Sequence, residues 1–520
     1  MRGSDSDGSG TEGLRFNLVI VKWSLLILCL IGAVMAVAQT PKLSVRGKDL
    51  VDPEGKVVPL RGCNLGNWLM IEFWMLGLDN KAGVTDQHDL FQTLDSRFGR
   101  HKREELIDLY RSRWIIDADF DTIKSFRFNV VRLPMDYRLF EDDANPYHLR
   151  ADAFKWTDRC IEMAKNKGIY VILDMHGIQG GQSPYDHTGW SGQNHFWDVP
   201  DNLKRAEWLW EQIAKKYKDE PAVVAYDLAN EPYGGTHDQE KLAYPRLLAG
   251  VRSVDPDKLV YLMGHYDDFT FYGDPAPQGW HNVGFQMHYY PGLFGNGNPT
   301  LVTHARHLAS LKPTEEIIDK WNVPFLVGEM NPVFASVGID MMRRHFDQHA
   351  SHGWATTMWS YKLMTEKGSF DGGSWGMVTN ADPVTPINFK TASLEEITGW
   401  INALGTRKWI VYDALRATMA PEKVALAPLP KEPPRRTTPP TAVEKPSWTS
   451  RPIGDAMAGS VVSKGDGADL YGSGGDVWGG SDAFQFLFQS VVGDFVATAQ
   501  IDSMDQLEAY AKAGWMARSS

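Results

Sequence analysis

The segment AVVAYDLANEP, residues 222–232, joins an apolar run to a polar Asn-Glu-Pro motif. Residues 222–229 have the length and the nearly continuous apolar character of a strand that is buried on both faces. Glu231 follows at once, where this strand is expected to end. Because such strands are typical of parallel sheets covered by helices, the segment predicts an α/β fold that carries a carboxylate at a strand end.

Seven further segments have the same strand-like character, namely residues 58–64, 128–134, 169–175, 258–264, 283–289, 324–330 and 354–360. Helical patterns lie between them. The clearest is DNLKRAEWLWEQIAKKYKD, for which we predict a helix that begins on an Asp201 cap. Eight strands alternating with helices predict a (β/α)8 TIM barrel. A dinucleotide-binding fold is disfavoured, because no Gly-rich phosphate-binding motif follows the first strand.

The N-terminal segment has the pattern of a secretory signal. Lys22 precedes an apolar run, and Ala36-Val37-Ala38 forms a small-x-small cleavage site. We therefore predict a signal peptide over residues 1–38, a secreted or periplasmic protein, and no stable membrane association after cleavage. An uncleaved anchor is the alternative, but residues 23–38 are fewer than the ~20 needed to span a bilayer.

The remaining chain is expected to contain three parts. Residues 39–420 would form the barrel, which is the catalytic domain, and residues 421–452 carry nine prolines in 32 positions, which indicates a semi-rigid linker. Residues 453–520 are rich in Gly, Asp and Ser with short apolar alternations, and they predict an incomplete all-β sandwich.

Composition excludes some classes of partner. The formal charge is −12 and the pI is near 5.7, so a nucleic-acid partner is not expected. Cys29 would leave with the signal peptide, and we expect the other two cysteines, Cys63 and Cys160, to be buried thiols, with a single bridge as the alternative. We expect a monomer.

Two glutamates occupy equivalent positions at strand ends. Glu231 follows the fourth predicted strand and Glu329 ends the seventh, so both would lie at the carboxyl-terminal mouth of the barrel and face each other. Taken singly, each could be a solvated strand-end charge. As a pair, they match the needs of glycoside hydrolysis, in which one carboxyl group protonates the leaving oxygen and the other attacks the sugar or activates water.

Six motifs in chain order carry a family resemblance. The motifs RLP, DMHG, NEP, MHYY, VGEM and MWSY place Arg132, His176, Asn230 with Glu231, His288 with Tyr290, Glu329, and Trp359 at strand ends. This set resembles glycoside hydrolase family 5 over roughly residues 45–420. The resemblance implies a retaining β-glycosidase in which Glu231 is the acid/base and Glu329 the nucleophile.

Physical chemistry agrees with these two roles. Glu231 must hold a proton, so we expect apolar surroundings and the charge on Glu329 to raise its pKa. Arg132, a permanent cation, would keep Glu329 ionised, with a structural ion pair as its alternative role. Asn230 would bind the sugar 2-hydroxyl. Because adjacent strand residues point to opposite faces, Asn230 and Glu231 require a backbone irregularity.

The other candidates would bind the sugar. Tyr290 would donate to the nucleophile, His288 would contact the sugar or Glu231, His176 lies in a sugar-contacting loop, and Trp359 would form an apolar floor. His176, His187 and His195 lack metal-site spacing, so we expect neither a metal nor a cofactor.

The loop NLGNWLMIE, with Trp68 and Glu72, is similar to the exo-β-1,3-glucanase branch of the family, in which Glu72 would bind hydroxyls of the terminal glucose. The expected substrate is therefore a β-glucan. Endo-β-1,4-glucanase, β-mannanase and xylanase activities are alternatives, as is a sugar-binding barrel without turnover. The tail motif GSGGDVWGGSDAFQFLFQ resembles the opening of a concanavalin A-like domain.

Overall fold

The computed structural model describes residues 40–419, except 267, 295–298, 334–336 and 371–374, together with residues 449–453, 460–464, 467–471 and 484–488. The predicted signal peptide and most of the predicted linker lie outside the described residues. Among the described residues, no helix is both long enough and apolar enough to cross a membrane. The chain divides into two compact units, Met1–Lys431 and Glu432–Ser520.

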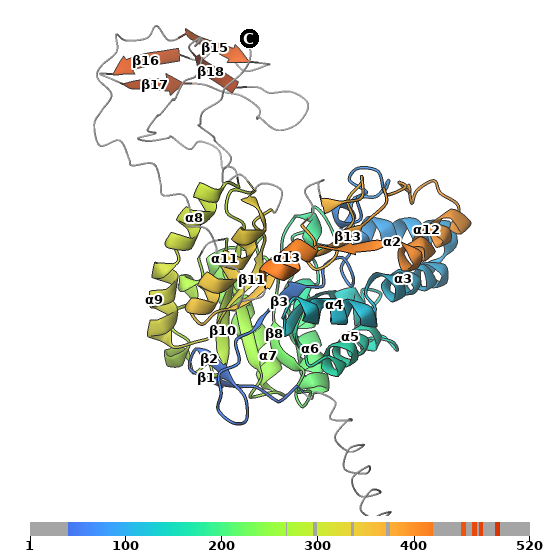
Figure 1. Ribbon diagram of the computed structural model, residues 1–520, viewed down its shortest axis with the longest axis horizontal. Helices are drawn as coiled ribbons and strands as arrows, with labels where there is room; N and C mark the ends of the chain where they lie inside the picture. The colour runs from blue at the N-terminus through green and yellow to red at the C-terminus, as the bar shows by residue number, and fades with distance from the viewer. Residues whose placement is uncertain are drawn as a thin grey trace, which may run out of the picture. The chain divides into compact units, whose positions relative to one another are not determined.

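Eight parallel strands form a closed barrel in the first unit (Figure 1). In barrel order they are β3 (Arg61–Asn64), β4 (Val130–Asp136), β7 (Tyr170–Gly177), β8 (Val223–Asp227), β9 (Leu259–Met263), β10 (Val283–Tyr289), β11 (Phe325–Met330) and β12 (Ala355–Met358), which pairs with β3. Each one lies within or overlaps a predicted segment, so the (β/α)8 prediction is confirmed. Burial on both faces explains the continuous apolar runs.

Helices surround the barrel strands (Figure 1). They are α2 (Gln87–Phe98), α3 (Arg100–Trp114), α4 (Asp117–Ser125), α5 (Lys155–Asn166), α6 (Pro200–Tyr217), α7 (His237–Arg252), α8 (Leu301–Ala309), α9 (Lys312–Trp321), α11 (Ile339–Ser351), α12 (Leu394–Thr406) and α13 (Asp413–Thr418).

The predicted start of α6 was wrong by two positions. The N-cap is Val199 rather than Asp201, and Pro200 occupies the first turn. A proline suits this position because the first turn of a helix leaves its N–H groups without helical partners. Asp201 lies in the same turn, where its charge favours the positive end of the helix dipole.

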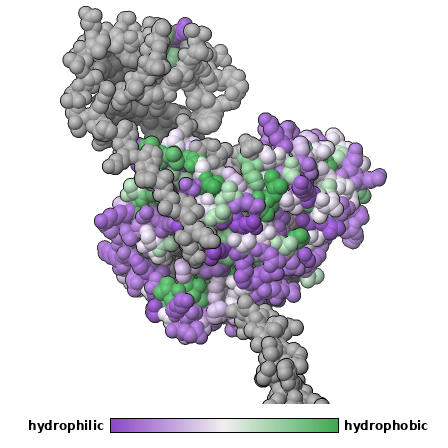
Figure 2. Space-filling model, viewed as in Figure 1, coloured by the Kyte–Doolittle hydropathy of each residue, from purple (hydrophilic) through white to green (hydrophobic). Residues whose placement is uncertain are grey.

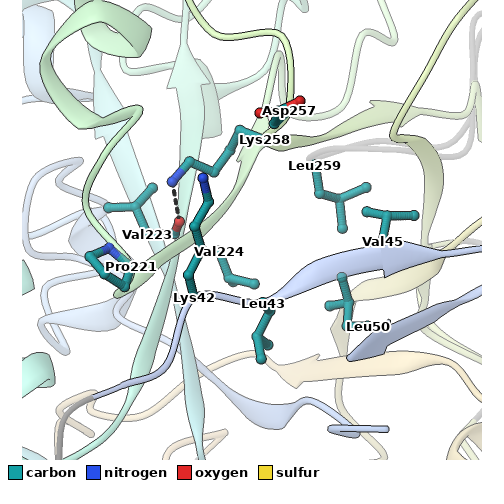
Figure 3. A pocket seen from close by; sticks show the side chains of 10 residues that line it. All are labelled: Lys42, Leu43, Val45, Leu50, Pro221, Val223, Val224, Asp257, Lys258 and Leu259. Atoms are coloured by element: carbon teal, nitrogen blue, oxygen red, sulfur yellow. Dashed lines mark hydrogen bonds between the residues drawn. The ribbon is translucent and has the colours of Figure 1, made fainter. Parts of the chain in front are cut away.

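A hairpin closes the amino-terminal end of the barrel. It is formed by β1 (Ser44–Arg46) and β2 (Asp49–Val51), and its Leu50 packs in a buried apolar cluster with Val224 and Leu259 of the barrel strands. Figure 3 shows this end from close by, with the Lys258 ammonium group donating to the Val223 carbonyl at 2.8 Å. In (β/α)8 barrels the active site lies at the opposite end, where the carboxyl ends of the strands meet.

The apolar side chains are mostly inside. The face seen in Figure 2 is mainly hydrophilic, with small separate apolar areas. Cys63 and Cys160 are both buried and unpaired, as expected for structural thiols. The first unit also contains two two-stranded antiparallel sheets, the hairpin of β5 (Glu141–Asp142) with β6 (Asn145–Leu149), and the pair of β13 (Val378–Asn380) with β14 (Trp409–Val411), between which α12 lies in the chain.

The second unit contains strands where β structure was predicted. Its described residues form two antiparallel pairs, β15 (Thr449–Ile453) with β18 (Phe484–Phe488), and β16 (Ser460–Lys464) with β17 (Gly467–Tyr471). Strand β15 begins four residues before the predicted boundary at 453. Whether this unit belongs to the concanavalin A-like class stays a prediction.

Candidate active site

A buried arginine organises the carboxyl-terminal mouth of the barrel. Arg132, on β4, is fully buried, and its Nη1 donates to Glu329 Oε1 at 2.9 Å. Its Nη2 donates to Asn230 Oδ1 at 2.8 Å, and its Nε donates to Asp227 Oδ2 at 2.9 Å. Burial lowers the pKa of Arg132, but the three carboxylates around it more than offset this effect and raise it. The guanidinium is therefore a fixed cation that holds three strand ends in register.

Glu329 lies near the end of β11 and accepts hydrogen bonds at both oxygens. Arg132 donates to Oε1, and the Tyr290 hydroxyl donates to Oε2 at 2.7 Å. Burial raises the pKa of Tyr290 well above its usual value, so this hydroxyl stays a donor. Only 6% of the Glu329 side chain is exposed. Two donors on one carboxyl group fix its orientation and match the acceptor geometry of an anion.

Glu231 is placed by a backbone turn beyond the end of β8. Its φ is +41°, in the left-handed region that a residue with a side chain rarely adopts. This is the predicted irregularity, and it allows the side chains of Asn230 and Glu231 to reach the same site. Because such a conformation costs about 1–3 kcal/mol, the surrounding contacts must maintain it.

The two glutamates lie close together on either side of a histidine. His288 Nδ1 is 2.7 Å from Glu231 Oε1 and 3.6 Å from Glu329 Oε2. One oxygen of each glutamate and a nitrogen of His288 all lie within 4.8 Å of one another. This proximity matches the separation of about 5–5.5 Å between carboxyl groups that a double displacement needs, rather than the 6.5–9.5 Å of an inverting site.

The environment of Glu231 favours its protonated form. Burial raises the pKa of Glu231, and the charge of Asp186 adds to this effect, while His187 and Arg132 lower it. The expected direction and the contribution of burial are confirmed. The negative neighbour that contributes is Asp186 rather than Glu329, because a 3₁₀ turn at Asp186–Thr188 brings it near.

A hydrogen-bond chain orients Asn230. Its Oδ1 accepts from Arg132, which has only donors, so the amide Nδ2 must point the other way, to within 3.4 Å of His176 Nε2. His176 Nδ1 lies 2.7 Å from Asp174 Oδ2. Burial lowers the pKa of His176 to about 3, so the ring is neutral and its Nδ1–H donates to the carboxylate. The amide N–H₂ of Asn230 is thus directed at His176 Nε2, which has the free lone pair to accept from it.

Aromatic side chains line the other side of the site. The Trp359 ring stacks on His176 at 5.4 Å and packs with Met75 and Leu363.

Glu72 is a buried carboxyl group with one free oxygen. It is 7% exposed, and its Oε2 accepts from Trp74 Nε1 at 2.8 Å, whereas its buried Oε1 has no protein partner. Burial raises the pKa of Glu72 to about 8, with Asp186 adding to the effect. A protonated Glu72 can donate as well as accept.

The structure does not bring Trp68 to this site. Its ring is fully buried in the main core, edge-on to Trp156, and its Nε1 donates to the Arg111 carbonyl at 2.8 Å. The substrate-binding prediction for Trp68 therefore does not fit the structure. The loop turns at Asn67, whose φ is +60°, and this turn sends Trp68 toward the helices while Glu72 remains near the mouth.

Sequence reasoning missed several residues of the site. Asp174 shares strand parity with His176, and this spacing was a usable signal. Asp227 is a charge inside an apolar run, which was a second signal. Asn64, by contrast, gave no signal, although its Oδ1 accepts from Arg132 Nη1 at 3.1 Å. Trp375 packs 5.8 Å from the Tyr290 ring but is distant in sequence, so only the fold relates them.

A family model described as "Cellulase (glycosyl hydrolase family 5)" matches residues 101–364, about half of the chain. The chain belongs to glycosyl hydrolase family 5. The family match spans β4 to β12 and includes both glutamates.

The similar proteins carry names that give two different activities, β-xylosidase and glucan 1,3-β-glucosidase. A β-xylosidase of Phanerodontia chrysosporium is 32% identical over 302 residues, covering 56% of this chain and 62% of that protein. A probable glucan 1,3-β-glucosidase A of Aspergillus clavatus is 30% identical over 237 residues, covering 44% and 55% respectively. The chain thus spans less than two thirds of the length of these two relatives. The rutinosidase structure from Aspergillus niger matches with a TM-score of 0.48 and 17% identity, over 59% of this chain and 90% of that one.

Proposed function

We propose that this chain is a retaining β-glycosidase that releases glucose from the ends of β-1,3-glucan. The observation that supports it most is the pair of glutamates at the barrel mouth, with oxygens within 4.8 Å of each other and in unlike environments. Glu329 accepts two hydrogen bonds as an anion would, whereas burial raises the pKa of Glu231. Unlike environments for two carboxyl groups separate a nucleophile from an acid.

In the first step, Glu329 Oε2 or Oε1 attacks the anomeric carbon, and the bond from that carbon to the leaving oxygen breaks. Glu231 gives its proton to the leaving oxygen, so that an alcohol departs and a glycosyl ester remains on Glu329. In the second step, Glu231, now a carboxylate, takes a proton from water. The resulting hydroxyl attacks the anomeric carbon and releases Glu329, so the β configuration is retained.

The supporting residues act on position and charge. Arg132 and Tyr290 fix the orientation of Glu329, so that the attacking oxygen does not have to be ordered during the reaction. Asn230 presents its amide N–H₂ to the sugar 2-hydroxyl, a contact that strengthens in the transition state. His288 contacts Glu231 and helps to hold it in position without taking its proton, because burial lowers the pKa of His288 to about 4 and keeps the ring neutral.

Substrate choice rests on the region around Glu72. Its free buried oxygen and raised pKa suit paired hydrogen bonds to two sugar hydroxyls, and Trp74 and Trp359 offer apolar faces to a pyranose ring. Several relatives named glucan 1,3-β-glucosidase support glucose as the sugar. A β-xylosidase activity is the second candidate, because the relative with that name is 32% identical.

The test compares products from laminarin, carboxymethyl cellulose and xylo-oligosaccharides for the wild type, Glu329→Gln and Glu231→Gln, with the exposed Glu54→Gln as a matched control. We expect glucose as the first product, only from laminarin, with β configuration by NMR. Glu54→Gln should retain full activity, while Glu329→Gln should lose at least about 10³-fold. Release of xylose would select the second candidate. An α-configured first product would refute the retaining mechanism.

Azide separates the roles of the two glutamates. In Glu231→Gln an aryl glucoside with a good leaving group should still form the glycosyl ester, and added azide should then yield a β-glucosyl azide. Glu329→Gln should give no such product. Equal rescue of both variants would contradict the assignment of the acid/base and the nucleophile.

The proposal includes secretion and a monomeric state. N-terminal sequencing of protein collected outside the expressing cells should begin at Gln39, which would place the cleavage after Ala38. A protein that keeps residues 1–38 and remains with the membranes would support the anchor alternative.

A further inference from the structure

A group of histidines lies outside the site described above, on two neighbouring helices. His304 and His307 are three residues apart on α8, and His345 and His349 are four residues apart on α11. Residues at these spacings lie on one face of a helix. The His304 and His345 rings contact edge to face at 5.1 Å, so the two faces meet. The glycosidase mechanism uses none of these four side chains.

Three of these histidines converge on one point. One ring nitrogen each of His307, His345 and His349 lies within 4.8 Å of the others. His345 is 1% exposed and His349 is fully buried, whereas His307 is partly exposed. Buried nitrogens without a protein partner remain on all three rings, namely Nε2 of His307, Nδ1 of His345 and Nε2 of His349. Buried polar atoms normally have a partner, so three together need an explanation.

The opposite nitrogens of two rings are already engaged. His345 Nε2 lies 2.9 Å from His304 Nδ1, and His349 Nδ1 lies 3.2 Å from Thr356 Oγ1. When His345 and His349 donate through these nitrogens, the lone pairs of His345 Nδ1 and His349 Nε2 remain without a protein partner and free to bind a metal ion. A histidine that binds a metal commonly donates its other N–H to a partner in this way, which fixes both its tautomer and its orientation.

We propose that His307, His345 and His349 form a binding site for a divalent first-row transition-metal ion, with Zn²⁺ as the expected occupant. Three imidazole donors suit Zn²⁺ and disfavour Ca²⁺ and Mg²⁺, which prefer oxygen. Nitrogens that share one zinc ion lie about 3.3 Å apart, given Zn–N distances of about 2.0–2.1 Å, so the rings must close by roughly 1.5 Å at most. The partly exposed His307 provides access for the ion and for a water as fourth ligand.

The site would brace the strands that carry the catalytic groups. The Tyr289 ring on β10 lies 4.7 Å from His307 and 6.1 Å from His349. Its chain neighbours, His288 on β10 and Tyr290 just beyond the strand end, contact the two glutamates. A metal at the cluster therefore ties α8 and α11 behind this strand, and we expect bound zinc to stabilise the fold rather than to take part in chemistry.

The test measures Co²⁺ and Zn²⁺ binding to the full chain carrying Glu231→Gln and Glu329→Gln. These substitutions weaken the other trio of potential ligands, Glu231, His288 and Glu329. Co²⁺ should give the visible absorption of a tetrahedral complex at one equivalent, and Zn²⁺ should displace it. Saturating Zn²⁺, at about 100 times Kd, should raise Tm by roughly 3–5 °C.

Two variants and a control decide the assignment. His307→Ala, at a partly exposed position, should keep the circular dichroism of the parent and lower Co²⁺ affinity at least 10-fold, and His349→Ala should do the same. His101→Ala, on the exposed face of α3, should change nothing. Absence of the Co²⁺ bands in the parent would overturn the proposal, as would equal binding by folded His307→Ala or loss of binding in His101→Ala.

Discussion

The hydroxyl of Tyr290 offers a sharp test of how Glu329 is held. Replacing Tyr290 with phenylalanine removes one oxygen that donates to Glu329 Oε2 at 2.7 Å. The ring remains, with its contacts to Phe294 at 5.4 Å and Trp375 at 5.8 Å. Arg132 still holds the other oxygen of the carboxylate, so Tyr290→Phe should loosen the nucleophile without unfolding the site.

The magnitude follows from the type of bond. A buried hydrogen bond to a charged group contributes about 1.5–3 kcal/mol. At about 1.4 kcal/mol for each factor of ten, loss of this bond in the transition state should lower kcat/KM about 10- to 150-fold. An aryl β-glucoside with a good leaving group is the suitable substrate, because its first step depends on the attack by Glu329 and little on protonation by Glu231.

The matched control is Tyr226→Phe. The Tyr226 hydroxyl is also buried and also donates to a carboxylate, Asp255 Oδ2 at 3.0 Å, but it lies on the helix-facing side of β8 against Trp210. Both variants should lose about 1–3 kcal/mol of unfolding free energy in urea. Only Tyr290→Phe should lose activity. A kcat/KM for Tyr290→Phe within twofold of the wild type would refute a positioning role for this hydroxyl.

Three further outcomes can be measured by urea or thermal unfolding. Burial raises the pKa of Glu72 to about 8 in the folded protein, from its ordinary 4.5. The free energy of unfolding of the wild type should therefore fall as pH rises from about 4.5 to 8. Relative to the wild type, Glu72→Gln should become more stable across that window, as measured by urea titrations at pH 5, 6.5 and 8. Gly328→Ala should lower stability by about 1–3 kcal/mol and reduce activity, because its Cβ would lie 2.2 Å from Gln286 Oε1 and 3.0 Å from His288 Nε2. The helical Gly399→Ala, with open space around its Cβ, should instead raise Tm, and a lower Tm would contradict this account. Lys362→Met breaks a buried pair with Asp119 and should cost about 3–5 kcal/mol. Lys48→Met, at a partly exposed pair, should cost under about 1 kcal/mol, and equal losses would count against burial as the cause.

The eight strands could be predicted from the sequence, because a strand that is buried on both faces consists of an apolar run of strand length. The position of Glu231 and Glu329 just beyond or at the ends of two such runs could be predicted for the same reason. Once the runs close into a barrel, all strand ends meet at one mouth, and residues 98 positions apart become neighbours. The pair of glutamates is therefore a property of the sequence pattern.

Only the tertiary structure decided the features that depend on loop direction and on contacts between distant segments. The turn at Asn67 sends Trp68 into the core, and the positive φ of Glu231 brings its side chain to the mouth. Neither follows from periodicity, which reports the spacing along one element and not its rotation against the next. The convergence of His307 with His345 and His349 depends on how α8 packs against α11, since that packing is set by all the side chains between them.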